Sequence, residues 1–307
     1  MQTGYWGKVL CIDLSTQQVK VEEPPESVYR RYLGGTGLGA QFLYDRIPAG
    51  ADPFGPENIL AFLPGLLTGS GAQFGGRFLA AGKSPLTGGW GEANCGGNFG
   101  LALRGAGFDA LLVSGISEKP VYLYIDESAI EIRPADELWG LDTQQTEARL
   151  QQLTAKDARV ACIGPAGEQR SLISGIVNDD GRLAARSGLG AVMGAKRLKA
   201  VVARGKKRPP LADQKRFQEA SATYLPVFRR KATRMQQLTL RWIKRLAPLM
   251  RRFKFEASMG EGTSDLLVES FRRYGTVALT AVAVEMGDTP VKNWGGIGYR
   301  DFPLASS

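Results

Sequence analysis

Short alternating runs of hydrophobic and polar residues fill the first 205 residues of the chain. The segments KVLCIDL and VKVEE alternate with a period of two and are joined by STQQ, a pattern that predicts an antiparallel hairpin. Further short apolar runs, each bounded by Gly, Pro, Asp or Asn, predict strands at NILAFLPG, RFLAAG, DALLVSG, VYLYID, AIEIRP, RVACIGP, LISGIV and KAVVARG. This part of the chain is therefore predicted to be rich in β-structure.

Helices are predicted between these strands, at residues 37–46, 98–106 and 143–154 and across GLGAVMGAKRL. Asp142 precedes the third helix and Gln145 follows three residues later, which is the spacing of a capping box. In RGKKRPPL, two prolines and a charge run predict a linker. Beyond it, DQKRFQEASATYLPVF and GTSDLLVESFRRYGTVALTAVAVEM indicate helices, so we expect a second, incomplete helical domain over residues 206–307.

Charge is distributed unevenly along the chain. The net charge is +9, yet residues 229–254 hold ten Lys and Arg and no acid, which leaves the rest at −1. A nucleic-acid-binding protein is expected to be basic over a whole face, so nucleic acid is not predicted as a partner. The basic segment 229–254 is interpreted either as a solvated helix face or as a docking surface for an acidic partner or a membrane surface.

The residue types present exclude several kinds of chemistry. The sequence has no histidine, which excludes Ser-His-Asp and Cys-His catalysis and the usual zinc sites within this chain. Cys11, Cys95 and Cys162 lie far apart and predict neither a disulfide framework nor a metal site. The sequence has no apolar run of about 18 residues and no signal-peptide pattern, so a cytoplasmic protein is expected. No catalytic residue is identified, and chemistry must come from carboxylates, a cofactor or residues elsewhere.

Glycine is concentrated between Gly65 and Gly100, where it occupies 12 of 36 positions, against about 7% in an average protein. Closely spaced glycines allow backbone N–H groups to approach a ligand and to form anion-binding turns. Arg77 directly follows a glycine pair, and ANCGGNFG leads into a predicted helix whose N-terminus favours an anion. The alternative interpretation is a set of tight β-turns in a compact barrel.

A second glycine-rich stretch, NDDGRLAARSGLGAVMGAKRLKA, repeats this arrangement with Arg186 before the glycines. Its glycine string invites a dinucleotide-binding interpretation, which is disfavoured because no clean βα turn precedes it and no acidic residue ends a strand about 20 positions later. Two arginine-flanked turns suggest a ligand with two similar anionic ends, or two copies of one ligand. A third cluster, LGGTGLGA, is interpreted as a loop and helix start that brings backbone close to a sheet.

Several long segments, found in order along the chain, resemble the aldehyde ferredoxin oxidoreductase family of tungsten or molybdenum pterin enzymes. They are GYWGKVLCIDLST, YLGGTGLGA, GGRFLAAGKSPLTGGWGEANCGGNFG, GAGFDALLVSG, IGPAGEQ, ARSGLGAVMGAKRLKAV and YGTVALTAVAVEMGDTPVKNW. The resemblance implies an α+β fold. In it, residues 1–205 form a β-rich, two-sheet metallopterin-binding domain, and residues 206–307 form part of a helical domain.

The resemblance also implies a set of cofactor contacts. The positions that match contacts to one pterin are Arg77, Asn94, Gly96 and Gly97, and those that match contacts to the other are Arg186, Ser187 and Gly188. Family members hold magnesium between the pterin phosphates through backbone carbonyls near Asn94 and Ser187, and magnesium prefers such oxygen ligands. The implied cofactor is a tungsten or molybdenum bis-pterin with magnesium.

The implied reaction is oxidation of a small aldehyde to a carboxylic acid, with electrons passing through a 4Fe–4S cluster to ferredoxin or another acidic carrier. Family members carry a CxxCxxxC group for this cluster beyond the segment that matches PVKNW, and the sequence contains no such group. We therefore expect a second polypeptide or a C-terminal half to supply it, and this chain alone to be inactive. A homodimer is a further candidate assembly. The alternative function is a non-redox metallopterin-binding or scaffold protein.

Overall fold

The computed structural model describes residues 3–229 and 264–279, together with residues 233, 234, 238, 296 and 301. The chain divides into two compact units, Met1–Phe217 and Gln218–Ser307. All but four residues of the basic segment 229–254 lie outside the described part. None of the helices described is long and apolar enough to cross a membrane.

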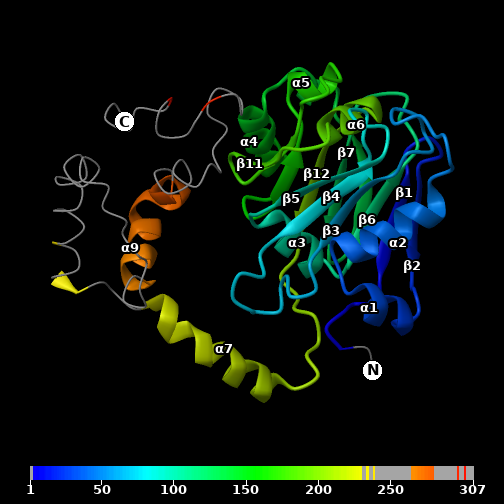
Figure 1. Cartoon of the computed structure of the whole chain (residues 1–307). Helices are drawn as coiled ribbons and strands as arrows, with labels where there is room; N and C mark the ends of the chain where they lie inside the picture. Colours follow the sequence, from blue (N-terminus) through cyan, green and yellow to red (C-terminus); the bar gives the residue numbers. More distant parts are fainter. Residues whose placement is uncertain are drawn as a thin grey trace. The chain divides into compact units, whose positions relative to one another are not determined.

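The first unit contains two mixed sheets (Figure 1). Within residues 3–229, the first sheet has the strand order β2-β1-β6-β3-β4-β5. In it β1 and β6 run parallel and the other neighbours run antiparallel. Its strands are β1 (Val9–Asp13), β2 (Gln18–Glu22), β3 (Leu60–Pro64), β4 (Phe78–Lys83), β5 (Trp90–Cys95) and β6 (Ala110–Ser114).

The second sheet has the order β11-β10-β9-β12-β7-β8 within the same described residues. Here β12 and β7 run parallel, and the other neighbours are antiparallel. Its strands are β7 (Val121–Asp126), β8 (Ile130–Pro134), β9 (Arg159–Cys162), β10 (Ile176–Asn178), β11 (Arg182–Ala184) and β12 (Leu198–Arg204). The predicted α+β fold with a two-sheet base is confirmed.

Two short helices, α3 (Phe99–Gly105) and α6 (Leu189–Ala195), pack between the sheets. Phe99 and Val192 share one core cluster with Leu10 of β1 and Val201 of β12. In each sheet, the strand residues that point away from α3 and α6 form the outer face of that sheet. On the first sheet they meet α1 (Glu26–Tyr32) and α2 (Thr36–Arg46), and on the second sheet they meet α4 (Thr143–Leu153).

Most of the predicted elements are present, and the differences have physical reasons. The β1–β2 hairpin forms as predicted, and α4 begins with the expected capping box of Asp142 and Gln145. The strand predicted at LISGIV begins only at Ile176, because a turn closed by Ser174 N and Ser171 O precedes it. The pattern missed β5, β11, α1, the 3-10 helix Asp136–Leu138 and the four-residue α5 (Pro165–Glu168).

The described part of the second unit is mainly helical. It comprises most of α7 (Gln214–Arg229), then α9 (Ser264–Tyr274) and the 3-10 helix Gly275–Leu279. Both helices lie in segments where the sequence predicts them, because their apolar residues recur at helical spacing. The proposed domain boundary between residues 205 and 206 stays a prediction.

Candidate functional site

Within the glycine-rich stretch, Trp90–Cys95 form β5, an edge strand of the first sheet that the sequence pattern did not predict. On its other side lies β11, the edge strand of the second sheet (Figure 1). The edges of the two sheets therefore meet along β5. Residues of both predicted pterin-binding sets contact this strand, so it is the centre of the candidate site.

Arg77 and Asn94 of the first set lie together at the start of β4 and the end of β5. Arg77 donates from Nε to Asn94 Oδ1 and from Nη2 to the Asn94 carbonyl oxygen, the latter at 3.2 Å. Both residues are exposed, and Arg77 makes no ion pair with any described residue. The guanidinium is therefore held by a neutral amide, which leaves its charge available to an anion.

The turn from β5 into α3 needs glycine at Gly97. Its φ is +110°, and a side chain there would collide with Asn178 Oδ1 and Asp179 Oδ2. Asp179 accepts a hydrogen bond from Asn98 N, and Asn178 Nδ2 donates to Cys95 Sγ at 3.1 Å. The β10–β11 turn, which belongs to the second sheet, thus contacts and positions the turn from β5 into α3 that is predicted to bind the cofactor.

Sequence reasoning missed Asn178 and Asp179. The signal available was NDDG, which favours a turn with left-handed residues. In the structure Asp179 and Asp180 have φ values of 44° and 52°, and Gly181 has a φ of 124°. The oxygen Asn178 Oδ1 is fully buried and accepts no hydrogen bond from the described residues.

The second predicted set lies against the same strand. Ser187 Oγ accepts from Glu92 N and donates to Glu92 O, each at 3.2 Å. Glu92 is two residues from Asn94 along β5, a rise of about 7 Å. The structure therefore brings Ser187 next to the first set, whereas the Arg186 side chain is exposed and forms no hydrogen bond or ion pair with described residues.

The glycines of the second stretch have clear packing roles. Gly188 has a φ of +64°, caps α6, and lies against the carbonyl oxygen of Leu172. Gly190 and Gly194 allow α6 to approach the carbonyl oxygens of Gly175 and Gly167. Close packing of a helix buried between two sheets is enough to explain this glycine string. The third cluster behaves as interpreted, with Gly39 of α2 packed against Leu63 of β3.

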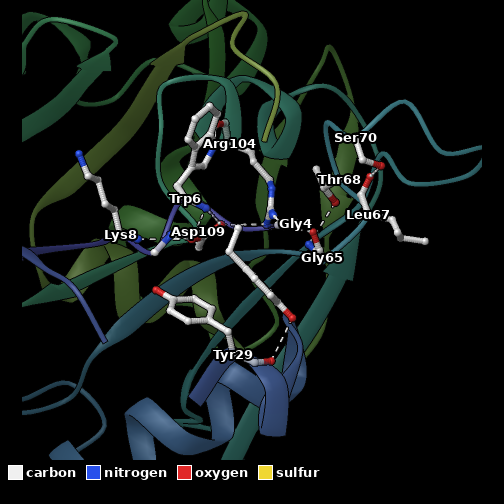
Figure 2. Close-up of polar contacts among 12 residues, drawn as sticks. Gly4, Trp6, Lys8, Tyr29, Gly65, Leu67, Thr68, Ser70, Arg104 and Asp109 are labelled. Atoms are coloured by element: carbon white, nitrogen blue, oxygen red, sulfur yellow. Dashed lines mark hydrogen bonds and ion pairs between the residues drawn. The ribbon is translucent and has the colours of Figure 1, made fainter. Parts of the chain in front are cut away.

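A buried ion pair joins Arg104 and Asp109 (Figure 2). Arg104, at the end of α3, contacts Asp109 at 3.2 Å and donates to the carbonyl oxygens of Gly65 and Gly4. Asp109 in turn accepts backbone N–H groups from Trp6, Gly7 and Lys8. The pair therefore ties the N-terminal segment to the loop that precedes Arg77. Sequence reasoning did not single out the pair, because the backbone groups that it binds, at residues 4–8 and at Gly65, are far from it in the chain.

Two positively charged side chains lie close to Cys95, at the start of the turn from β5 into α3. Burial raises the pKa of the Cys95 thiol, while the hydrogen bond from Asn178 and the positive charges of Arg77 and Arg182 oppose that rise. Two guanidinium groups are thus close to one buried residue beside Gly96. Arg182, on β11, is a further residue that sequence reasoning missed.

The predicted magnesium ligands are backbone carbonyls, and both take part in hydrogen bonds. The Asn94 carbonyl accepts from Arg77 Nη2, and the Ser187 carbonyl accepts from Ser84 Oγ at 2.9 Å. Among the described residues, no three His, Cys, Asp or Glu side chains gather into a metal site. The magnesium ligands and the pterin contacts of all seven residues stay predictions.

Comparison with known proteins places this chain in a family. Residues 9–205 match the model of the aldehyde ferredoxin oxidoreductase N-terminal domain. A tungsten-containing aldehyde ferredoxin oxidoreductase of Thermococcus kodakarensis is 47% identical over 215 residues, covering 70% of this chain and 36% of the relative. The Pyrococcus horikoshii protein of the same name is 45% identical over 217 residues, with the same coverage of each chain.

Other relatives carry different names. The WOR-like subunit of an aliphatic sulfonate oxidoreductase from Pyrococcus furiosus is 33% identical over 218 residues, covering 66% of this chain and 35% of the relative. Among solved structures, the BamBC active-site complex of benzoyl coenzyme A reductase superimposes with a TM-score of 0.72 at 36% identity, covering 74% of this chain and 35% of that one. The chain spans about a third of the length of these relatives. The chain belongs to the aldehyde ferredoxin oxidoreductase family and contains its N-terminal domain.

Proposed function

We propose that this chain is the cofactor-binding part of a tungsten pterin oxidoreductase. The observation that carries the proposal is the meeting of both predicted sets along β5. Arg77 binds Asn94 at one end of the strand, and Ser187 binds Glu92 two residues away. A bis-pterin has two phosphate-bearing halves, and two adjacent turns of this kind suit such a ligand.

The residues present fit a phosphate-bearing group. Gly96 leaves its backbone beside two guanidinium groups, and a Cβ there would lie 3.4 Å from Arg77 Nη1. Arginine forks bind phosphate with short, charge-assisted hydrogen bonds. Arg77, Asn94, Gly96 and Gly97 would hold one half, and Arg186, Ser187 and Gly188 the other. Magnesium between the phosphates, near the carbonyls of Asn94 and Ser187, belongs to the same proposal.

The bound metallopterin supplies the two-electron redox chemistry, and the protein supplies binding and orientation. The proposed reaction is oxidation of an aldehyde to a carboxylic acid, and it is supported by the relatives that are 47% and 45% identical, which are named aldehyde ferredoxin oxidoreductases. The proposed acceptor is ferredoxin or another acidic carrier, reached through a 4Fe–4S cluster. Its cysteine ligands would come from another polypeptide or from further chain, since the sequence has no CxxCxxxC group. We propose a cytoplasmic location.

Elemental analysis tests the proposal directly. The chain, expressed in a host that makes metallopterin and is supplied with tungstate, is expected to carry tungsten and phosphorus. Arg77→Gln is expected to lose most of both, whereas Arg149→Gln, on the exposed surface of α4, is expected to keep them. Equal tungsten and phosphorus contents in the two variants would count against the proposal.

A viologen-reduction assay separates the redox function from the scaffold alternative. We expect no aldehyde-dependent reduction by the chain alone and reduction once a polypeptide with the cluster ligands is added. A chain that binds pterin and stays inactive with that polypeptide present would favour the scaffold function. The relatives, all oxidoreductases or reductases by name, favour the redox function.

A further inference from the structure

A hollow lies beside the proposed cofactor site, between the glycine-rich loop and the linker. Its volume is about 460 Å³, and one wall is formed by residues of the loop 69–76. The other wall is formed by the linker residues 205–208, and Leu101 of α3 completes the lining. Both walls belong to the first unit. Because Gly76 directly precedes Arg77, a partner seated in this hollow would lie next to the proposed pterin site.

The linker wall is held in place by backbone contacts with the end of α3. Lys207 N donates to the carbonyl oxygen of Gly105 at 3.2 Å. Gly205 approaches the same end so closely that an added Cβ would lie 2.0 Å from Ala106 N. The segment that the sequence predicts as a linker is therefore fixed against the first unit. A preformed wall of this kind lowers the entropy cost of binding a partner.

The linker wall carries three neighbouring cations. The side chains of Lys206, Lys207 and Arg208 are all exposed. Lys206 Nζ lies 2.8 Å from Asp157, and Lys207 Nζ lies 3.5 Å from Glu127. Exposed pairs of this kind contribute little to stability, so both ammonium groups can exchange partners. Arg208 forms no side-chain hydrogen bond or ion pair with a described residue, and its charge is open to an acidic partner.

The opposite wall adds an exposed aromatic ring. Phe74 is 75% exposed, and its φ of 61° lies in the left-handed region, which is rare for a large side chain. The loop is folded back at this point, because a Cβ added at the next residue, Gly75, would lie 2.6 Å from the carbonyl oxygen of Leu67. A strained backbone that presents an exposed ring beside a hollow points to a role in binding.

We propose that this hollow, with its basic linker wall and Phe74, is the docking surface for an acidic electron-carrier protein. Electron-transfer partners bind through small, weak interfaces whose association rate depends on complementary charge. Three exposed cations around one apolar contact suit a partner that presents carboxylates around a small apolar surface. The position beside Arg77 brings the carrier close to the redox site. The proposal rests on the proposed function, which supplies the electrons that the carrier accepts.

Binding of an acidic 4Fe–4S ferredoxin to the purified chain, measured by calorimetry at two ionic strengths, tests this surface. Lys207→Gln combined with Arg208→Gln is expected to weaken binding about tenfold at low ionic strength and to reduce its salt dependence. Phe74→Ala is expected to weaken binding by a similar factor at both ionic strengths, because it removes an apolar contact. The matched control is Lys119→Gln combined with Arg149→Gln. It removes the same charge from exposed positions that do not line the hollow, and its affinity is expected to be unchanged.

Several results would overturn the docking surface. They are the absence of binding by the unsubstituted chain, unchanged affinity in the Lys207 and Arg208 double variant, and equal weakening in the control, which would make net charge the cause. A loss seen only with Arg251→Gln combined with Arg252→Gln would assign docking to the basic segment 229–254 in place of the hollow. All the substituted residues that the structure describes are exposed, so near-native unfolding midpoints are expected.

The tungsten and phosphorus contents of the same preparations separate a failure of the docking surface from a failure of the proposed function. The double variant and Phe74→Ala are expected to keep both elements, because neither change touches the proposed cofactor contacts. Unchanged ferredoxin affinity in a double variant that carries tungsten would overturn the docking surface and leave the proposed function standing. An unsubstituted chain without tungsten or phosphorus would count against the proposed function, whatever its ferredoxin affinity.

Discussion

Thr68 Oγ1 donates a hydrogen bond of 2.8 Å to the carbonyl oxygen of Arg77. The same hydroxyl accepts from Gly65 N at 3.1 Å, and Gly65 O in turn accepts from Arg104. Thr68 is 1% exposed, so no water competes for these bonds. The backbone of the exposed Arg77 is therefore positioned by a buried network that begins at the ion pair in Figure 2.

Thr68→Val tests whether this network positions Arg77. The substitution keeps the shape and removes two hydrogen bonds, so we expect a loss of about 1–3 kcal/mol in the free energy of unfolding. We also expect weaker phosphate binding. Ser70→Ala is the control, because Ser70 Oγ bonds Leu67 O in the same loop and does not touch Arg77. Urea unfolding and phosphate calorimetry supply the two readouts, and a destabilised Thr68→Val with unchanged phosphate affinity would reject the positioning role.

Asp109→Ala is expected to lower the free energy of unfolding by about 3–5 kcal/mol, since it leaves Arg104 charged and buried without its partner. Both side chains of the pair are at most 1% exposed. The control is Glu26→Ala, which removes the exposed Glu26–Arg30 pair of α1 and is expected to cost less than about 1 kcal/mol. Denaturant unfolding measures both, and similar values for the two variants would contradict the expectation.

The buried Lys196 side chain is expected to make a pH-dependent contribution to the free energy of unfolding. Burial lowers its pKa from 10.5 to about 8, and its Nζ donates to the carbonyl oxygens of Asn58 and Gly115. Because the folded-state pKa is depressed, the stability contribution is fully present above pH 10.5 and is lost as the pH falls through 8. The difference in unfolding free energy between the native chain and Lys196→Met should therefore rise with pH.

The rise between pH 7 and pH 10.5 is expected to be on the order of 3 kcal/mol, which corresponds to the shift in pKa. Taking the difference against Lys196→Met removes the titration of the other groups. A difference that stays constant over this window would show that Lys196 has an ordinary pKa in the folded chain.

The three cysteines should differ in reactivity toward a thiol reagent. Burial raises the pKa of Cys162 to about 12, so almost none of it is thiolate near neutral pH. Cys95 is also buried, whereas Cys11 is partly accessible. At pH 8 we expect labelling of Cys11 first and of the other two only after unfolding. Peptide mapping by mass spectrometry checks the order, and early labelling of Cys162 would contradict its burial.

How far the sequence predicts the fold depends on whether the signal is local. The β1–β2 hairpin and α4 follow from alternation and a capping box within a few residues, and both formed as expected. The strand β5 was missed because the glycines within and on both sides of it suggest turns. Its strand conformation comes from pairing with β4, a tertiary contact that local propensity does not report.

The candidate site shows the same division. Arg77 and Asn94 could be named together because both lie in one glycine-rich motif. Arg182 and Asp179 could not, since both reach the turn from the β10–β11 hairpin, a separate segment of the chain. Only the meeting of the two sheet edges places Arg182 beside Gly96.

The central position of α3 and α6 has a consequence for assembly. Each helix is preceded by one of the two proposed binding turns, and each is enclosed by both sheets. A nascent chain that has made only its first sheet still lacks β11 with Arg182, and the segment after β11 that contains Ser187. Under the proposed function, the two binding sets are therefore complete only once the second sheet has formed.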